Sequence, residues 1–277
     1  MQLKRFGRLA GIMAAVAAMT SMLAGAAYGA TPAPGYERFA GCQTPAENPK
    51  SEMCMRSVIK SGYFEMGNKK VPIENPVPLT GNVDEEAENF GFNSEGGLKP
   101  VKQKVPGGVV GLTGLTWLLE LLGSDALTLY SVVEPVGLPV LKINRKPQEI
   151  QLPIRVHLIN SVLGSKCYVG SPTTPILLNL TTGTTSPPPP NTPMTGIDPE
   201  LSINPETQVI SATGARFVDN SFSAPGASGC TLTLFGFIPI SINGLVNTQS
   251  GLPAPAGTNE TVQNIDVEFA PVSRVYP

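Results

Sequence analysis

The chain has 277 residues, a net charge of −2 and only 14% charged residues. It lacks the surplus of Lys and Arg with which proteins contact nucleic-acid phosphates, so no nucleic-acid partner is expected. Its 29 glycines and 28 prolines disfavour long helices and require frequent turns. This composition excludes a helical bundle and favours an all-β protein.

Residues 1–29 have the order of a secretory signal peptide. Three basic residues precede an apolar run rich in Ala and Met, and the small residues Ala27 and Gly29 end the segment. We expect cleavage after Gly29 and a secreted, extracellular or cell-envelope-associated protein without a transmembrane segment in the mature chain. The alternative is an uncleaved membrane anchor, which is disfavoured because small residues, as a cleavage site requires, follow the apolar run.

The remaining chain is predicted to have two parts. Residues 30–60 predict an extended N-terminal segment that carries a disulfide loop, since residues 31–48 are rich in Pro, Gly and Ala. Residues 61–277 predict a β-rich domain, with a possible division into sub-domains at the Pro-rich residues 184–196.

Four cysteines, Cys42, Cys54, Cys167 and Cys230, follow the signal segment. An even number in an exported chain favours two disulfides, for which three pairings are possible. We predict Cys42–Cys54, which closes a short loop, and Cys167–Cys230, which joins two strand-rich regions. The sequence has no CxxC motif and a single His, so neither a metal site nor a cofactor is expected.

Two strand patterns are especially clear. Gly67-Asn68 separates two β-type runs, residues 62–67 and 69–73, and is typical of a hairpin turn. Apolar residues then occupy every second position from Ile150 to Leu158, which predicts a half-buried antiparallel strand. Pro153 favours the edge of the sheet or the start of strand pairing, because proline has no N–H to donate.

Residues 105–123 are the most apolar segment after the signal sequence. Their leucine spacing predicts one short helix that is buried, with a packed loop left open, and the alternative is a surface that faces lipid or a partner, with Trp117 as an interfacial anchor. Prolines and glycines argue against a membrane-spanning helix. The candidate apolar contact residues are Leu112, Leu115, Trp117, Leu118, Leu119 and Leu122.

The sequence offers little support for catalysis. A hydrolase triad would require His157, which alternation places on the polar strand face beside Arg155, and no GxSxG motif is present. The acidic residues 84–88 predict a solvated loop, because their spacing differs from that of an EF-hand calcium site. No catalytic residue is predicted, although two convergent carboxylates of a glycan hydrolase remain an alternative.

Several segments show a resemblance to known proteins. LPIRVHLINSVLGSKCYVGSPTTPILLNLTTGTTSPPPPNTP, FVDNSFSAPGASGC, GLPAPAGTNETV and GYFEMGNKKVPIENPVPLTG, with the Cys42–Cys54 loop, resemble secreted proteins of actinobacteria that have no assigned activity. The resemblance implies export and a shared fold, and it implies no catalytic residue.

We therefore expect an all-β antiparallel sandwich or barrel-like domain with one short apolar helix and two disulfides. We expect it to act as a non-catalytic binding or surface module, whose partner could be a cell-envelope component. The alternative is a carrier that shelters an apolar ligand or lipid between the sheet and the Leu112–Leu122 segment.

Overall fold

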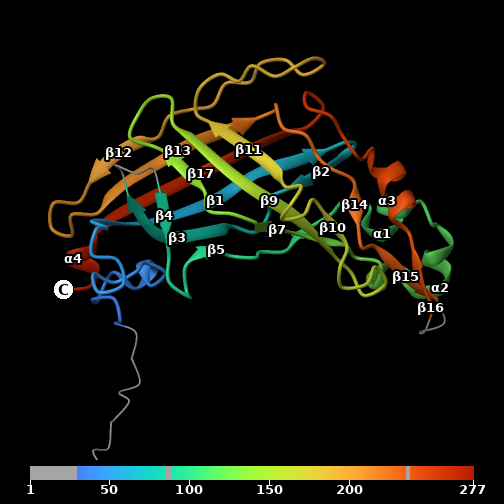
Figure 1. Ribbon diagram of the computed structural model, residues 1–277, viewed down its shortest axis with the longest axis horizontal. Helices are drawn as coiled ribbons and strands as arrows, with labels where there is room; N and C mark the ends of the chain where they lie inside the picture. The colour runs from blue at the N-terminus through green and yellow to red at the C-terminus, as the bar shows by residue number, and fades with distance from the viewer. Residues whose placement is uncertain (1–29, 85–88, 235–237) are drawn as a thin grey trace, which may run out of the picture.

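The computed structural model describes residues 30–84, 89–234 and 238–277. Fifteen antiparallel strands form one curled half-barrel sheet, whose main order is β14-β10-β9-β11-β13-β17-β1-β3-β4. Figure 1 shows this sheet as an arch, with α4 near one end and α1, α2 and α3 at the other. The predicted all-β antiparallel, barrel-like fold is confirmed, and the strands curl as one sheet instead of forming a sandwich.

The strands of the large sheet, in chain order, are β1 (Met53–Met66), β2 (Lys69–Pro72), β3 (Val77–Asp84), β4 (Asn89–Gly91), β5 (Gly97–Leu98), β6 (Gln103–Lys104), β7 (Tyr130–Pro135), β8 (Val140–Lys142), β9 (Glu149–Ile159), β10 (Tyr168–Val169), β11 (Ile176–Thr181), β12 (Glu200–Ile203), β13 (Ile210–Asp219), β14 (Ala227–Ser228) and β17 (Glu260–Pro271). A separate pair consists of β15 (Thr231–Leu234) and β16 (Ile238–Ser241). The helices are η1 (Glu37–Phe39), α1 (Gly108–Thr113), α2 (Trp117–Ala126), α3 (Asn243–Ser250) and α4 (Val272–Val275).

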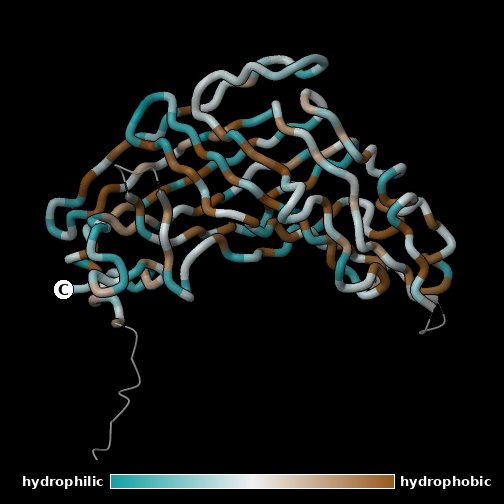
Figure 2. Tube along the Cα trace, viewed as in Figure 1, coloured by the Kyte–Doolittle hydropathy of each residue, from teal (hydrophilic) through white to brown (hydrophobic). Residues whose placement is uncertain are grey.

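The alternating run from Ile150 to Leu158 forms β9, and its faces are those that the spacing predicts. Ile154, Val156 and Leu158 are buried, whereas Arg155 and His157 lie on the opposite face of the strand. Figure 2 shows the same change between apolar and polar residues along the strands of the arch.

The predicted edge position of Pro153 is wrong, because β9 has strands on both sides. On one side Pro153 is opposite Leu177 of β11. On the other side β7 ends at Pro135 and β8 begins at Val140, so the missing N–H of Pro153 faces a gap between two strands. The interruption lets a proline occupy an interior strand.

The predicted hairpin at Gly67-Asn68 is confirmed, since Met66 of β1 pairs with Lys69 of β2. β1 is also the long central strand that pairs with β3 and with β17. The boundary predicted at residue 60 therefore falls within β1. Strands from both sides of residues 184–196 belong to the same sheet.

The apolar segment does not form the one short helix that its leucine spacing predicts. Gly114, with φ 74°, ends α1, and α2 begins at Trp117 in a new direction. Leu112 and Leu118 are buried, but Trp117, Leu119 and Leu122 are exposed by 44%, 45% and 40%. The prediction of a buried helix is therefore wrong for α2, because the break at Gly114 removes the common face.

Candidate functional site

An apolar hollow lies between the sheet and the helices α1 and α3. This hollow is a cavity of about 110 Å³, and most of the side chains that line it are apolar. Its wall includes the inward residues of β9, so the face predicted from alternation is also the face that lines the hollow. Residues that contribute to the wall include Ile59, Phe64, Met66, Val71, Val133, Leu152, Ile154, Val156, Leu158, Leu178, Val246 and Leu252.

A second apolar hollow of about 340 Å³ adjoins the first. Leu98 and Leu152 line both, so the two hollows are neighbours that share these side chains in their walls. The second hollow continues towards Phe92 and Leu138, which are exposed by 39% and 59%. We refer to these two neighbouring hollows together as the apolar tract, which has α3 at one end and Phe92 at the other.

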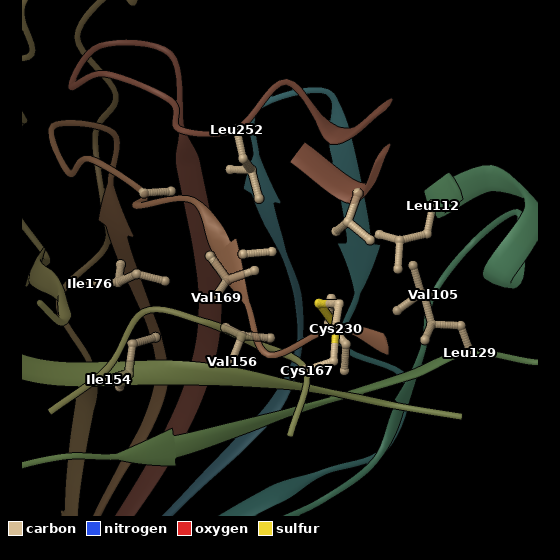
Figure 3. Close-up of a cluster of buried hydrophobic side chains, with 14 of the residues drawn as sticks. Val105, Leu112, Leu129, Ile154, Val156, Cys167, Val169, Ile176, Cys230 and Leu252 are labelled. Atoms are coloured by element: carbon tan, nitrogen blue, oxygen red, sulfur yellow. A yellow bond between two sulfur atoms is a disulfide. The ribbon is translucent and has the colours of Figure 1, made fainter. Parts of the chain in front are cut away.

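Close packing surrounds the cavity on the side of the disulfide. Figure 3 shows Val105, Leu112 and Leu129 on one side of the Cys167–Cys230 bond and Val156 and Val169 on the other. Both cysteines are fully buried in the main hydrophobic cluster. The predicted Cys167–Cys230 disulfide is therefore confirmed, and it ties the segment before β10 to the segment before β15.

The structure separates the predicted apolar contact residues. Leu112 lines the cavity, Leu118 is buried in the main hydrophobic cluster, and Leu115 packs against that cluster from a partly buried position. Trp117, Leu119 and Leu122 point away from the cavity and are exposed. The sequence analysis missed the contribution of β1 and β2, although Phe64, Met66 and Val71 keep the alternation typical of an inward strand face.

The polar groups in the cavity wall are few, and the side chains of Gln103, Lys99 and Gln263 have protein partners. The Gln103 side-chain oxygen accepts hydrogen bonds from the backbone N–H groups of Glu74 and Asn75, both at 3.0 Å. The Lys99 ammonium donates to the Glu95 carbonyl at 2.6 Å. Gln103 thereby holds the backbone at Glu74 and Asn75, and neither Gln103 nor Lys99 offers a nucleophile activated by a base.

His157 lies on the other face of β9, away from the cavity. Its Nδ1 is 3.2 Å from a Glu134 oxygen, and its ring stacks on Tyr168 with 4.2 Å between the ring centroids. Glu134 also accepts a hydrogen bond from Arg155 at 2.9 Å. The predicted polar face is confirmed, but the ring is more covered than a solvent-facing residue, with 18% of its side chain exposed.

Cys42 and Cys54 lie together at the other end of the sheet as free, fully buried thiols. Burial, with the neighbouring Cys54, raises the pKa of the Cys42 thiol. Burial also raises the pKa of Tyr276 to about 12, and its hydroxyl donates to the Cys42 carbonyl at 3.1 Å. The two sulfurs are adjacent, and the Cys42–Cys54 disulfide stays a prediction.

Within residues 30–84, 89–234 and 238–277, no group of three or more His, Cys, Asp or Glu side chains has a geometry suited to a metal ion. Most of the acidic segment considered for calcium, residues 85–88, lies outside the described residues. No helix in the described part of the chain is both long and apolar enough to span a membrane. The signal segment 1–29 also lies outside the described residues.

Comparisons with other proteins do not add to this geometry. No protein-family model, curated protein or solved structure matches the chain.

Proposed function

We propose that the protein is exported and that it binds an apolar ligand in the tract between the sheet and α1 and α3, without catalysing a reaction. The observation that carries the proposal is the pair of neighbouring apolar hollows, whose walls share Leu98 and Leu152. Protein interiors are normally packed as densely as organic crystals, and an apolar void lowers stability. Apolar tracts of this kind, open at one end, are typical of small-molecule binding sites.

Two further features support a binding role in an oxidising compartment. The tract contains few polar groups, so an apolar ligand would displace water without leaving many protein groups unsatisfied. The Cys167–Cys230 disulfide closes the main cluster beside the cavity, and such bonds persist in exported proteins.

The experiment is to place a large side chain in the wall that the hollows share. Leu152→Trp does so, while Leu177→Trp places the same ring on the outer face of β11, where Leu177 is exposed by 49%. Binding is measured with N-phenyl-1-naphthylamine, an uncharged dye that fluoresces in apolar surroundings. We expect the Leu152→Trp variant to bind the dye at least about tenfold more weakly, a loss of roughly 1.4 kcal/mol, and Leu177→Trp to bind it as the unmodified protein does.

Circular dichroism and thermal unfolding establish that both variants are folded. Absence of dye binding by the unmodified protein would show that the tract is not a ligand site. Equal binding by the two tryptophan variants would place the dye elsewhere on the protein.

A further inference from the structure

We propose that the ligand is an amphiphile with one apolar chain and an anionic head, and that Lys69 binds the head. This inference rests on the proposed binding function and adds the chemical class of the ligand. It follows from the polar groups at the α3 end of the cavity.

Lys69 occupies an inward position of an otherwise apolar strand face. It pairs with Met66, and Val71 pairs with Phe64, and all four side chains line the cavity. Cross-strand partners lie on the same side of a sheet, so the Lys69 stem is directed to the cavity by the register itself. An aliphatic side chain would pack equally well at this position, so packing does not explain why the residue carries an ammonium group.

The neighbouring Lys70 provides an internal comparison. It faces the opposite side, where its ammonium is 3.1 Å from a Glu65 oxygen and 3.5 Å from the centroid of the Tyr63 ring. Lys69 has no carboxylate within ion-pairing distance among the described residues. Lys70 therefore has ion-pair partners, whereas Lys69, on the cavity side, has none among the described residues.

Ser250 is an independent sign of a ligand at the same place. It lines the cavity, is only 2% exposed, and its Oγ has no hydrogen-bond partner among the described groups. The Asn68 N–H donates to the Ser250 carbonyl at 3.0 Å, which holds the turn before Lys69 against the end of α3. A buried hydroxyl without a partner is costly, and a ligand oxygen would satisfy it.

The direction of the chain follows from the position of these two groups. Lys69 lies at the level of Met66 of β1, whereas Leu98, which lines both hollows, pairs with Leu79 opposite Ser57 of β1. At about 3.3 Å per residue the distance from Met66 to Ser57 is roughly 30 Å, so a single long acyl chain fits within it. The head would meet Lys69 and Ser250, and the chain would extend towards Leu98 and Leu152.

The test compares ligands that differ only in the head. Palmitate and 1-hexadecanol are used to displace N-phenyl-1-naphthylamine from the protein, and 1-palmitoyl lysophosphatidate is the phosphate-bearing counterpart. We expect palmitate to bind about tenfold more tightly than hexadecanol, because hydrogen bonds to a charged group are roughly twice as strong as neutral ones. Tighter binding of lysophosphatidate than of palmitate would identify a phosphate head, and the reverse order a carboxylate head.

The matched variants are Lys69→Met and Lys166→Met. Lys166 is exposed to solvent and, like Lys69, has no ion pair among the described residues, but it does not line the cavity. Lys69→Met should abolish the preference for palmitate and keep hexadecanol binding, whereas Lys166→Met should change neither. Ser250→Ala should reduce palmitate affinity by about threefold, and it provides a second test should Lys69→Met fail to fold.

Equal affinities for palmitate and hexadecanol in the unmodified protein would overturn the anionic head and leave the apolar site intact. An undiminished preference in Lys69→Met would overturn the assignment of Lys69. Failure of all three lipids to displace a bound dye would instead overturn the proposed function itself.

Discussion

The two ends of the sheet differ in how completely their apolar side chains are buried. At the end that we call the closed end, η1 and α4 pack with β1 and β17 into a small cluster that includes Phe39, Cys42, Cys54, Ala270, Val272 and Val275, all at most 3% exposed. At the cavity end, Phe64 and Met66 are only partly buried and line a hollow. None of the closed-end residues lines either apolar hollow.

The difference lies in what covers the sheet. At the closed end the segments around Ala33 and Val272–Val275 are hydrogen-bonded to each other and to the start of β1: the Ala33 N–H donates to the Val275 carbonyl, and the Val272 N–H to the Glu52 carbonyl, both at 2.8 Å. At the cavity end α1 and α3 lie over the sheet, and the cavity remains between these helices and the strands. The comparison teaches that one continuous sheet can provide a tightly packed anchor and a space for a ligand, because strand hydrogen bonds do not dictate how side chains are covered.

The largest expected loss in the free energy of unfolding comes from a change at the cavity end. Replacing both Cys167 and Cys230 by Ala removes a bond across a sequence separation of 63 residues, and the chain-entropy model predicts a loss of about 4 kcal/mol in the free energy of unfolding. Urea unfolding followed by circular dichroism measures this loss. A change below about 1 kcal/mol would mean that packing alone holds the segments around the cavity.

A second pair of variants compares aromatic packing at the two ends. Phe39→Ala at the closed end should lower the free energy of unfolding by about 3–4 kcal/mol, the cost of truncating a fully buried phenylalanine. Phe64→Ala should cost about 1–2 kcal/mol, because this ring is partly buried and already borders a hollow, although it contacts Phe222 at 5.2 Å between centroids. Equal losses in urea unfolding would contradict the looser packing of the cavity end.

The smallest effect concerns the thiols of the closed end. Because burial raises the pKa of Cys42, the folded protein keeps a proton that the unfolded chain releases above its ordinary thiol pKa of about 8.5. The stabilisation is therefore complete below that pH, and the reduced protein should lose roughly 1 kcal/mol between pH 8.5 and pH 9.5. Urea unfolding under reducing conditions at the two pH values measures the difference.

The control for this prediction is the Cys42→Ala, Cys54→Ala variant, which should show a smaller loss over the same pH range. Material exported to the culture medium, which we expect to begin near Ala30, should carry the Cys42–Cys54 bond when peptides are mapped without reduction. A thiol titration unaffected by folding would show that the pair is accessible to solvent.

Local patterns in the sequence were enough to predict some of the site. The apolar alternation that identified β9 also assigned the face of Ile154, Val156 and Leu158 that lines the cavity. Gly67-Asn68 located the β1–β2 hairpin, and with it the register that turns Lys69 inward. Lys69, Val71 and Ile73 occupy alternate positions, which places their side chains on one face of a strand. This pattern indicates an inward lysine only when it is known that a cavity lies on that face.

Other parts of the site depended on contacts between distant segments. The leucine spacing of residues 112–122 predicted a single buried face, which the left-handed conformation of Gly114 divides between α1 and α2. Pro153 was assigned to an edge because the gap between β7 and β8 has no local signature. The Ser250 hydroxyl, which has no hydrogen-bond partner among the described groups, could not be identified at all, since the cavity that it lines is built from segments far apart in the chain.

The sequence by itself determined that the chain forms antiparallel β-structure, which face of β9 is buried, and which hairpin joins β1 to β2. These properties follow from the two-residue period of a strand and from turn chemistry, both of which act over a few residues. Only the tertiary structure decided that the strands curl into one half-barrel, that the apolar segment divides at Gly114, and that an apolar tract remains beneath α1 and α3. Curling and coverage depend on side chains brought together from far apart in the chain, and local sequence patterns do not carry that information.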